Sequence, residues 1–279
     1  MGAAFCFALM NLFVRLSGDL PSIEKSFFRN VVAAVVAIFL LIKSGEKINI
    51  KGGLGLLMVR ATGGTVGILC NFYAIDHLNI SDATMLNKLS PFFAIIFSAI
   101  FLKEMANHVQ IASVVIAFLG SLFIIKPQFS AEVIPAVIGT IGGLGAGIAY
   151  TAVRRLGQKG IKGTVIVMFF SVFSCLVTLP GFIILYKPMT GLQLLCLIMA
   201  GVSATGGQFF ITAAYTFAPA KDISVFDYSQ VVFSALLGFF FLSQVPDIYS
   251  VIGYCIICMV AIYMWNYNKK VEVSHEANM

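Results

Sequence analysis

The chain has 279 residues, of which 59% are hydrophobic and only 11% are charged, and its mean hydropathy is +0.97. Soluble proteins carry about 25% charged residues, so this composition excludes a soluble fold and predicts an integral membrane protein. The net charge of +6 does not indicate a nucleic-acid partner, because the basic residues gather in short loops between apolar runs, where lipid headgroups and membrane topology account for them.

Apolar runs separated by short polar breaks predict an all-α protein with ten transmembrane helices. A helix needs about 20 residues to cross the hydrocarbon core of a bilayer. The predicted spans are residues 2–17, 26–42, 54–74, 81–102, 108–126, 133–153, 164–186, 191–214, 222–243 and 248–267. The connections between them are short, so we expect no separate soluble domain.

The fourth predicted span carries polar side chains on one helix face. Thr84, Asn87 and Lys88 share this face with Pro91, because they follow the helical spacing i, i+3, i+4 and i+7. A charge inside a bilayer costs a few kcal/mol unless it faces a partner or a wet cavity. We therefore expect this face to look toward other helices or toward water, and not toward lipid.

The third and eighth predicted spans carry similar stripes of polar and small residues. The stripe of the third span is Arg60, Gly64, Gly67 and Asn71, and that of the eighth is Gly201, Thr205, Gln208 and Thr212. Two interpretations stay open. The stripes line a cavity whose amide and guanidinium groups bind a solute, or their small residues allow close helix packing.

The second half of the chain repeats the first at an offset of 140 residues. Arg15 and Leu16 correspond to Arg155 and Leu156, and the Phe-Leu pair at 101–102 corresponds to that at 241–242. Five spans per repeat is an odd number, so the second copy enters the membrane upside down. The predicted units are residues 1–127 and 133–268, followed by a cytoplasmic tail at 269–279. Inverted repeats are typical of secondary transporters, whose solute site lies near the midplane between the halves.

The distribution of Lys and Arg predicts the orientation in the membrane. With a cytoplasmic N-terminus, the cytoplasmic loops and the tail hold eleven of these residues and the opposite loops hold five. Because cytoplasmic loops are enriched in Lys and Arg, we expect a multi-pass protein of the plasma membrane with both termini cytoplasmic.

A motif in the fourth span, together with Phe28-Arg29 in the second span and the duplicated five-helix plan, resembles the EamA-type branch of the drug/metabolite transporter superfamily. The motif consists of Ala83-Thr84-Met85-Leu86, Ser90-Pro91-Phe92-Phe93 and Phe101-Leu102-Lys103-Glu104. The second half departs from it, with Gln230-Val231 in place of Ser90-Pro91 and Ser243-Gln244 in place of Lys103-Glu104. The resemblance covers essentially the whole chain. It implies a transporter from a superfamily that moves amino acids, nucleotide-linked metabolites, vitamins and drugs, and it does not identify the solute. With the positive charge of Lys88 inside a span, we expect a small organic solute, either an amino-acid-like or other carboxylate- or phosphate-bearing metabolite, or a drug.

Eleven residues are candidates for the solute path: Asn11, Arg60, Asn71, Thr84, Asn87, Lys88, Tyr150, Gln208, Tyr215, Asp227 and Tyr228. We expect Lys88 to face a carboxylate or phosphate of the solute, or alternatively to extend toward the outer surface. Counting along straight helices places Lys88 and Asp227 on opposite sides of the midplane, on the order of 10 Å apart. The same count places Arg60 at the depth of Asp227, which predicts an ion pair between these two residues. Asp227 is the only acid deep within a span and is a candidate for proton coupling.

The sequence predicts no catalytic residue, metal site or cofactor. The Walker sequence G-x-x-x-x-G-K-[ST] is not present, so we expect no ATP hydrolysis. The three histidines and six cysteines are dispersed, and the glycines at 143, 145 and 147 indicate close helix contact more than a nucleotide-binding loop. Two alternatives to a carrier stay open, a membrane-embedded enzyme and a non-transporting membrane subunit. Uptake and efflux in vesicles distinguish the carrier from both.

Overall fold

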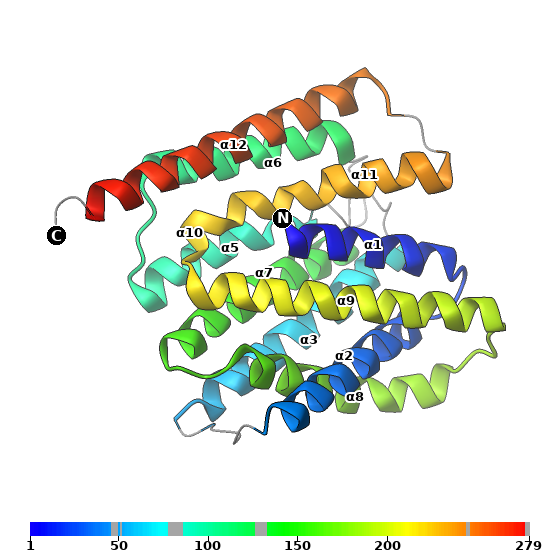
Figure 1. Cartoon of the computed structure of the whole chain (residues 1–279). Helices are drawn as coiled ribbons and strands as arrows, with labels where there is room; N and C mark the ends of the chain where they lie inside the picture. Colours follow the sequence, from blue (N-terminus) through cyan, green and yellow to red (C-terminus); the bar gives the residue numbers. More distant parts are fainter. Residues whose placement is uncertain (46–49, 51, 78–85, 126–132, 244–245, 277–279) are drawn as a thin grey trace.

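The computed structural model describes residues 1–279 except 46–49, 51, 78–85, 126–132, 244–245 and 277–279. All regular structure in these described residues is helical (Figure 1). The elements are α1 (Gly2–Leu16), α2 (Ser22–Ser44), α3 (Leu54–His77), α5 (Ser90–Phe97), the π-helix η1 (Ser98–Leu102), α6 (His108–Ile125), α7 (Val133–Gln158), α8 (Gly163–Leu185), α9 (Gly191–Phe217), α10 (Ala220–Ile223), the 3₁₀-helix η2 (Ser224–Tyr228), α11 (Ser229–Leu242) and α12 (Ile248–Glu276).

Eight helical segments among the described residues are long and apolar enough to cross a membrane. They are α2, α3, α6, α7, α8, α9, the composite segment Ala220–Leu242 and α12, and two shorter apolar helices cover Gly2–Leu16 and Ser90–Leu102. Large apolar side chains cover the outside of the bundle, and Ile42, Ile184 and Phe217 are each at least 75% exposed. Such a surface suits contact with lipid, so the prediction of an all-helical, multi-pass membrane protein is confirmed.

Side chains that follow the sequence rules for helix termini define several of the helix ends. Thr190 and Gln193 form a reciprocal capping box at the start of α9. The side-chain oxygen of Asn107 accepts from the Gln110 N–H at 2.9 Å before α6, and that of Asp247 accepts from the Ser250 N–H at 3.0 Å before α12. These caps satisfy backbone donors that have no partner within the helix.

The fourth predicted span is interrupted where the sequence predicted a continuous helix. Leu86 and Asn87 are helical, Lys88 and Leu89 form a turn, and α5 begins at the next residue. Pro91 explains the break, because it has no N–H to donate to the carbonyl of Asn87 and its ring would clash with that carbonyl. Asn87 and Lys88 line an internal cavity, as expected of a polar face that avoids lipid, but the regular helical spacing from Asn87 to Pro91 does not hold across this turn. Thr84 lies outside the described residues.

The ninth predicted span is interrupted as well, by the 3₁₀-helix η2 between α10 and α11. The two interruptions meet inside the bundle. The hydroxyl of Tyr228 donates to the backbone carbonyl of Lys88 at 3.0 Å, and the Lys88 ammonium donates to the backbone carbonyl of Asp227 at 3.2 Å. The break in the ninth span therefore coincides with a contact made by residues far away in the sequence.

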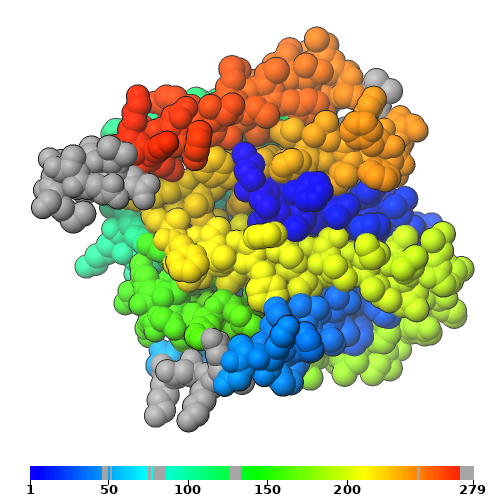
Figure 2. All heavy atoms as spheres, viewed as in Figure 1, coloured from blue at the N-terminus to red at the C-terminus, as the bar shows by residue number. Residues whose placement is uncertain are grey.

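Helices from the two halves of the chain pack against one another. α3 packs along α7, α1 along α9, α2 along α8 and α6 along α12. Figure 1 shows this interleaving, and Figure 2 shows α1 and α9 side by side on one face of the molecule. Glycines let α3 and α7 approach closely, since a Cβ at Gly145 would lie 2.8 Å from the carbonyl oxygen of Gly63. A Cβ at Gly143 would lie 2.8 Å from the carbonyl oxygen of Leu86. The predicted close helix contact is confirmed at these glycines.

Candidate functional site

A cavity of about 810 Å³ lies inside the bundle, with walls from α1, α2, α3, α6, α7, α8, α9, α11 and α12. Its lining includes Gly18 and Asp19, in the connection between α1 and α2, Leu242, the last residue of α11, and Pro246, in the connection before α12. Both connections lie at one end of the bundle, away from the C-terminus (Figure 1). The cavity therefore opens toward the end that holds these connections.

Three buried cations from three different segments line the cavity. Arg29 of α2 is 6% exposed, Arg60 of α3 is 2% exposed, and Lys88, in the turn before α5, is 6% exposed. Asp19, at the mouth, is the only acid among the described lining residues. The interior of the cavity is therefore positively charged, which favours an anionic ligand.

Arg60 is held from two sides. Its Nη2 donates to Oε1 of Gln208 at 3.0 Å, and its guanidinium carbon lies 4.0 Å from the ring centroid of Phe170. Gly64, one turn further along α3, leaves space for this side chain, because a Cβ there would collide with the guanidinium. The predicted ion pair between Arg60 and Asp227 is wrong: these two described residues form no ion pair, and Arg60 contacts the amide of Gln208 and the ring of Phe170 instead.

Lys88 is bound by the second half of the chain. Its Nζ donates to Oε1 of Gln230 at 2.7 Å and to the backbone carbonyl of Asp227 at 3.2 Å. The predicted separation of Lys88 and Asp227 across the midplane is wrong, because the two interrupted spans cross at this point instead of running as straight helices. The alternative in which Lys88 extends to the outer surface is also wrong, because its ammonium lies in buried contacts.

Two stacked tyrosines lie near the deep part of the cavity. The rings of Tyr150 and Tyr215 are 4.6 Å apart and nearly parallel, with an interplanar angle of 9°. The Tyr215 hydroxyl lies 3.5 Å from Oδ2 of Asp227, at the limit of a hydrogen bond. Tyr150 belongs to the cavity lining, whereas Tyr215 and Asp227 lie behind it.

The structure brings most of the predicted path residues together. Those that line the cavity are Asn11, Arg60, Asn71, Asn87, Lys88, Tyr150 and Gln208. Tyr215, Asp227 and Tyr228 are not among the lining residues, and Thr84 is not described. The stripe of α3 serves both predicted purposes, since Arg60 and Asn71 face the cavity while Gly67 also contacts α7.

Arg29, Phe170 and Gln230 line the cavity but were not among the predicted path residues. With the second span predicted to begin at residue 26, Arg29 was expected close to the membrane surface and not beside the solute path. α2 begins at Ser22, so Arg29 lies about two turns inside the helix. Its position within an apolar run was the signal that could have identified it.

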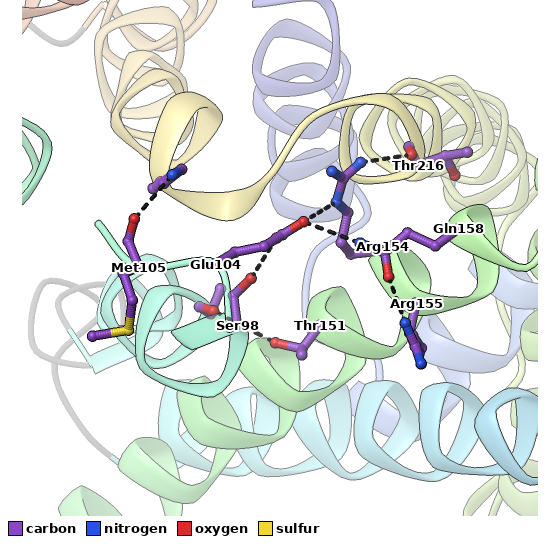
Figure 3. A network of polar contacts seen from close by, with 10 residues as sticks. Ser98, Glu104, Met105, Thr151, Arg154, Arg155, Gln158 and Thr216 are labelled. Carbon is purple, nitrogen blue, oxygen red and sulfur yellow. Dashed lines mark hydrogen bonds and ion pairs between the residues drawn. The ribbon is translucent and has the colours of Figure 1, made fainter. Parts of the chain in front are cut away.

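A polar network, seen from close by in Figure 3, lies where α7 and α9 end, and Figure 1 shows this end of the bundle opposite the connection between α1 and α2. Nε of Arg154 lies 2.8 Å from Oε1 of Glu104, and Nη1 of Arg154 donates to the carbonyl of Thr216 at 3.0 Å. Ser98 and Gln158 also donate to the Glu104 carboxylate, at 2.8 and 3.1 Å. The network joins the segment after η1 to α7 and α9. Arg154 lies one helical turn beyond the cavity-lining Tyr150, so the network seals the bundle just below the stacked tyrosines.

A helical membrane bundle with a charged cavity that is open at one end and sealed at the other is the arrangement of a membrane carrier. The chain belongs to the EamA-like transporter family, whose model matches residues 1–126 and 134–266. The resemblance to the drug/metabolite transporter superfamily is therefore confirmed, and the protein is a transporter and not an enzyme.

Relatives match the chain over most of its length. The pseudopaline exporter CntI of Pseudomonas aeruginosa is 32% identical over 266 residues, which cover 93% of this chain and 92% of that protein. Human solute carrier family 35 member G1 is 29% identical over 277 residues, covering 93% and 75%. A crystal structure with 16% sequence identity matches 93% of each chain with a TM-score of 0.82, which is a likeness of fold.

Proposed function

We propose that the protein is a secondary transporter that moves a small organic solute bearing a carboxylate or phosphate group across the membrane by alternating access. The observation that carries this proposal is the pair of buried arginines, Arg29 and Arg60, which leave side-chain N–H donors without a partner among the described residues and line a cavity whose one described acid, Asp19, lies at the mouth. A buried charge is costly without a partner, and a solute anion supplies that partner.

We further propose ten membrane crossings, arranged as two inverted five-helix repeats at residues 1–127 and 133–268. The helix contacts support this division. At the offset of 140 residues, α3 corresponds to α9, α5 to α11 and α1 to α7. The α3–α7 contact therefore has its counterpart in the α9–α1 contact, and the α5–α7 contact in the α11–α1 contact. The pairs α2–α8 and α6–α12 each join a helix to its own counterpart.

Individual residues support the same repeat at the offset of 140. The non-glycine residues with positive φ in the described chain are Lys103 and Ser243, at +58° and +55°. The capping residues Asn107 and Asp247 also lie 140 positions apart in the sequence. A conformation that is rare for residues with a Cβ recurs at matching positions, which is expected of a duplicated unit.

The proposed orientation places both termini in the cytoplasm and the protein in the plasma membrane, as the excess of Lys and Arg on that side favours. The cavity mouth at Gly18 and Asp19 then faces outward, and the Glu104–Arg154 network closes the cytoplasmic end. The structure then corresponds to the outward-facing state of the transport cycle. Breaking the network and closing the mouth produces the opposite state.

The solute class is tested by counterflow in liposomes that contain the purified protein. Metabolites that change in cells with and without the protein are used first, each paired with a neutral amide or ester of the same skeleton. We expect the anion to exchange about 10-fold to 100-fold faster than its neutral analogue, because a hydrogen bond to a charged group contributes about 1.5–3 kcal/mol. Equal exchange of both members of every pair would contradict the proposed solute class, and protein-free liposomes provide the background.

Asp227 is the group we propose for proton coupling. It contacts the Tyr215 hydroxyl, and its backbone carbonyl binds Lys88, so its charge lies next to the cavity wall. We expect Asp227→Asn to retain counterflow exchange but to lose accumulation of solute driven by a proton gradient, because the amide does not titrate. The measurement compares both activities in the same proteoliposomes. A variant that still concentrates solute under the gradient would exclude this role.

A further inference from the structure

We infer that Arg29 and Arg60 bind the anionic group of the solute, and that Lys88 is a positioning residue that joins the two interrupted helices. This inference rests on the proposed function and assigns different roles to the three cations of the cavity. It also replaces the sequence-based expectation that Lys88 faces the solute anion.

Arg29 has donors that the protein leaves unused. Its side chain is 94% buried and lines the cavity, yet Nε and Nη1 have no hydrogen-bond partner among the described residues. A guanidinium presents five N–H donors in a planar fork that matches a carboxylate or phosphate. Because a buried charged donor without a partner is costly, a ligand oxyanion in the cavity is the partner that this side chain lacks.

Arg60 provides the second half of the site. Gln208 and Phe170 hold its guanidinium in place, and its Nε has no partner among the described residues. Arg29 and Arg60 line the same cavity, and both leave guanidinium donors unused. Because like charges in a low-dielectric interior repel each other, an oxyanion bound at this pair relieves the repulsion and fills the unused donors, so the two arginines favour the same ligand group.

The contacts of Lys88 are of a different kind. Two of its three ammonium donors are used by Gln230 and by the carbonyl of Asp227, and its own carbonyl accepts from Tyr228. All three partners belong to the second half of the chain. Lys88 therefore holds the two interrupted spans together through hydrogen bonds, and protein oxygens already solvate its charge.

The test compares Arg29→Gln with Lys88→Gln. Each variant removes one positive charge from the same cavity and leaves an amide of similar size, so the pair differs only in which cation is lost. Purified protein is unfolded thermally in detergent with increasing citrate, acetate, inorganic phosphate or sulfate, at ionic strength held constant with chloride. Unfolding is followed with a thiol-reactive dye as the rise in signal above the level of the folded protein, because Cys255 and Cys258 are exposed in the folded protein whereas Cys196 is buried.

We expect at least one oxyanion to raise the unfolding midpoint of the wild type by about 2 °C or more, as a ligand specific for the folded state does. Arg29→Gln is expected to require about 10-fold to 100-fold more of that anion for the same shift. Lys88→Gln is expected to unfold at a lower temperature without ligand but to keep the wild-type dependence on the anion.

A second pair of variants covers the case in which a glutamine variant does not fold. Arg29→Lys keeps the charge but loses the fork, so it is expected to bind the anion more weakly than the wild type. Lys88→Arg is expected to bind it equally well.

The reverse pattern, in which only the Lys88 variants lose the response, would overturn this inference and leave the proposed function standing. If no oxyanion stabilises the wild type, both the inference and the proposed solute class fail.

Discussion

Replacement of Gly145 by alanine is expected to lower the free energy of unfolding by about 1–3 kcal/mol, the usual cost of overpacking a tight contact. A Cβ at this position would lie 2.8 Å from the carbonyl oxygen of Gly63 and 3.2 Å from the amide nitrogen of Gly67. Backbone atoms cannot rotate away as a side chain can, so α3 and α7 must separate. Packing, and not the exclusion of water, holds helices together in lipid. Separating α3 from α7 therefore weakens van der Waals contacts along the helix pair and destabilises the folded protein.

Gly55→Ala is the matched control for this effect. Gly55 is also a helical glycine, in α3, but a Cβ there would meet nothing within 4 Å. We expect this variant to be at least as stable as the wild type, because alanine favours helix over glycine. Both variants are compared by thermal unfolding of purified protein in detergent. Equal stability of the two variants would show that α3 and α7 do not approach this closely.

With the proposed orientation, Arg154→Gln is expected to open the end of the cavity that faces the cytoplasm. The side chains of Arg154 and Glu104 are only 16% and 15% exposed, so their ion pair is largely shielded from water. Removing a charged hydrogen-bond partner costs about 1.5–3 kcal/mol, which changes the ratio of closed to open states by about 10-fold to 100-fold. The change is measured by labelling Ser234→Cys, at the cavity wall, with an impermeant thiol reagent from each side of oriented vesicles.

We expect labelling from the cytoplasmic side to rise and labelling from the opposite side to fall. The parent protein without Ser234→Cys provides the background from native cysteines. Arg155→Gln is the matched control, because it removes the same charge from the next residue, which is exposed and bonded to Gln158. Exchange of the two charges, Glu104→Arg with Arg154→Glu, is expected to restore part of the wild-type pattern. A shift of equal size in Arg155→Gln would show that the ion pair does not hold this end closed.

Hydropathy predicted the positions of the helices well, because the length of an apolar run is set by the thickness of the bilayer. The interruptions were harder to predict. Pro91 marks the first one locally, whereas the segment Ser224–Tyr228 contains no proline or glycine. This segment forms a 3₁₀-helix, and its residues Asp227 and Tyr228 form hydrogen bonds with Lys88. These residues lie about half the chain away from Lys88 in the sequence. Patterns of neighbouring residues do not carry that information.

The candidate site was predicted in part for a similar reason. A charged residue in an apolar span must avoid lipid, so Arg60 and Lys88 were correctly placed at a cavity. Their partners were predicted from depth along straight helices, and that arithmetic fails where a helix is broken and its carbonyls become free to accept hydrogen bonds. Asp227 therefore binds Lys88 through its backbone and does not pair with Arg60.

The salt bridge at the sealed end has no equivalent in the other half of the chain. Counting back 140 residues from Arg154 reaches Val14, an apolar residue. In the proposed carrier of two repeated units, the two orientations of the empty protein then differ in free energy. In the proposed alternating-access cycle, one half-cycle must separate these opposite charges and the return half-cycle re-forms them. With the proposed orientation, we therefore expect the unloaded protein to favour the state whose cavity faces the exterior, and its two reorientation rates to differ.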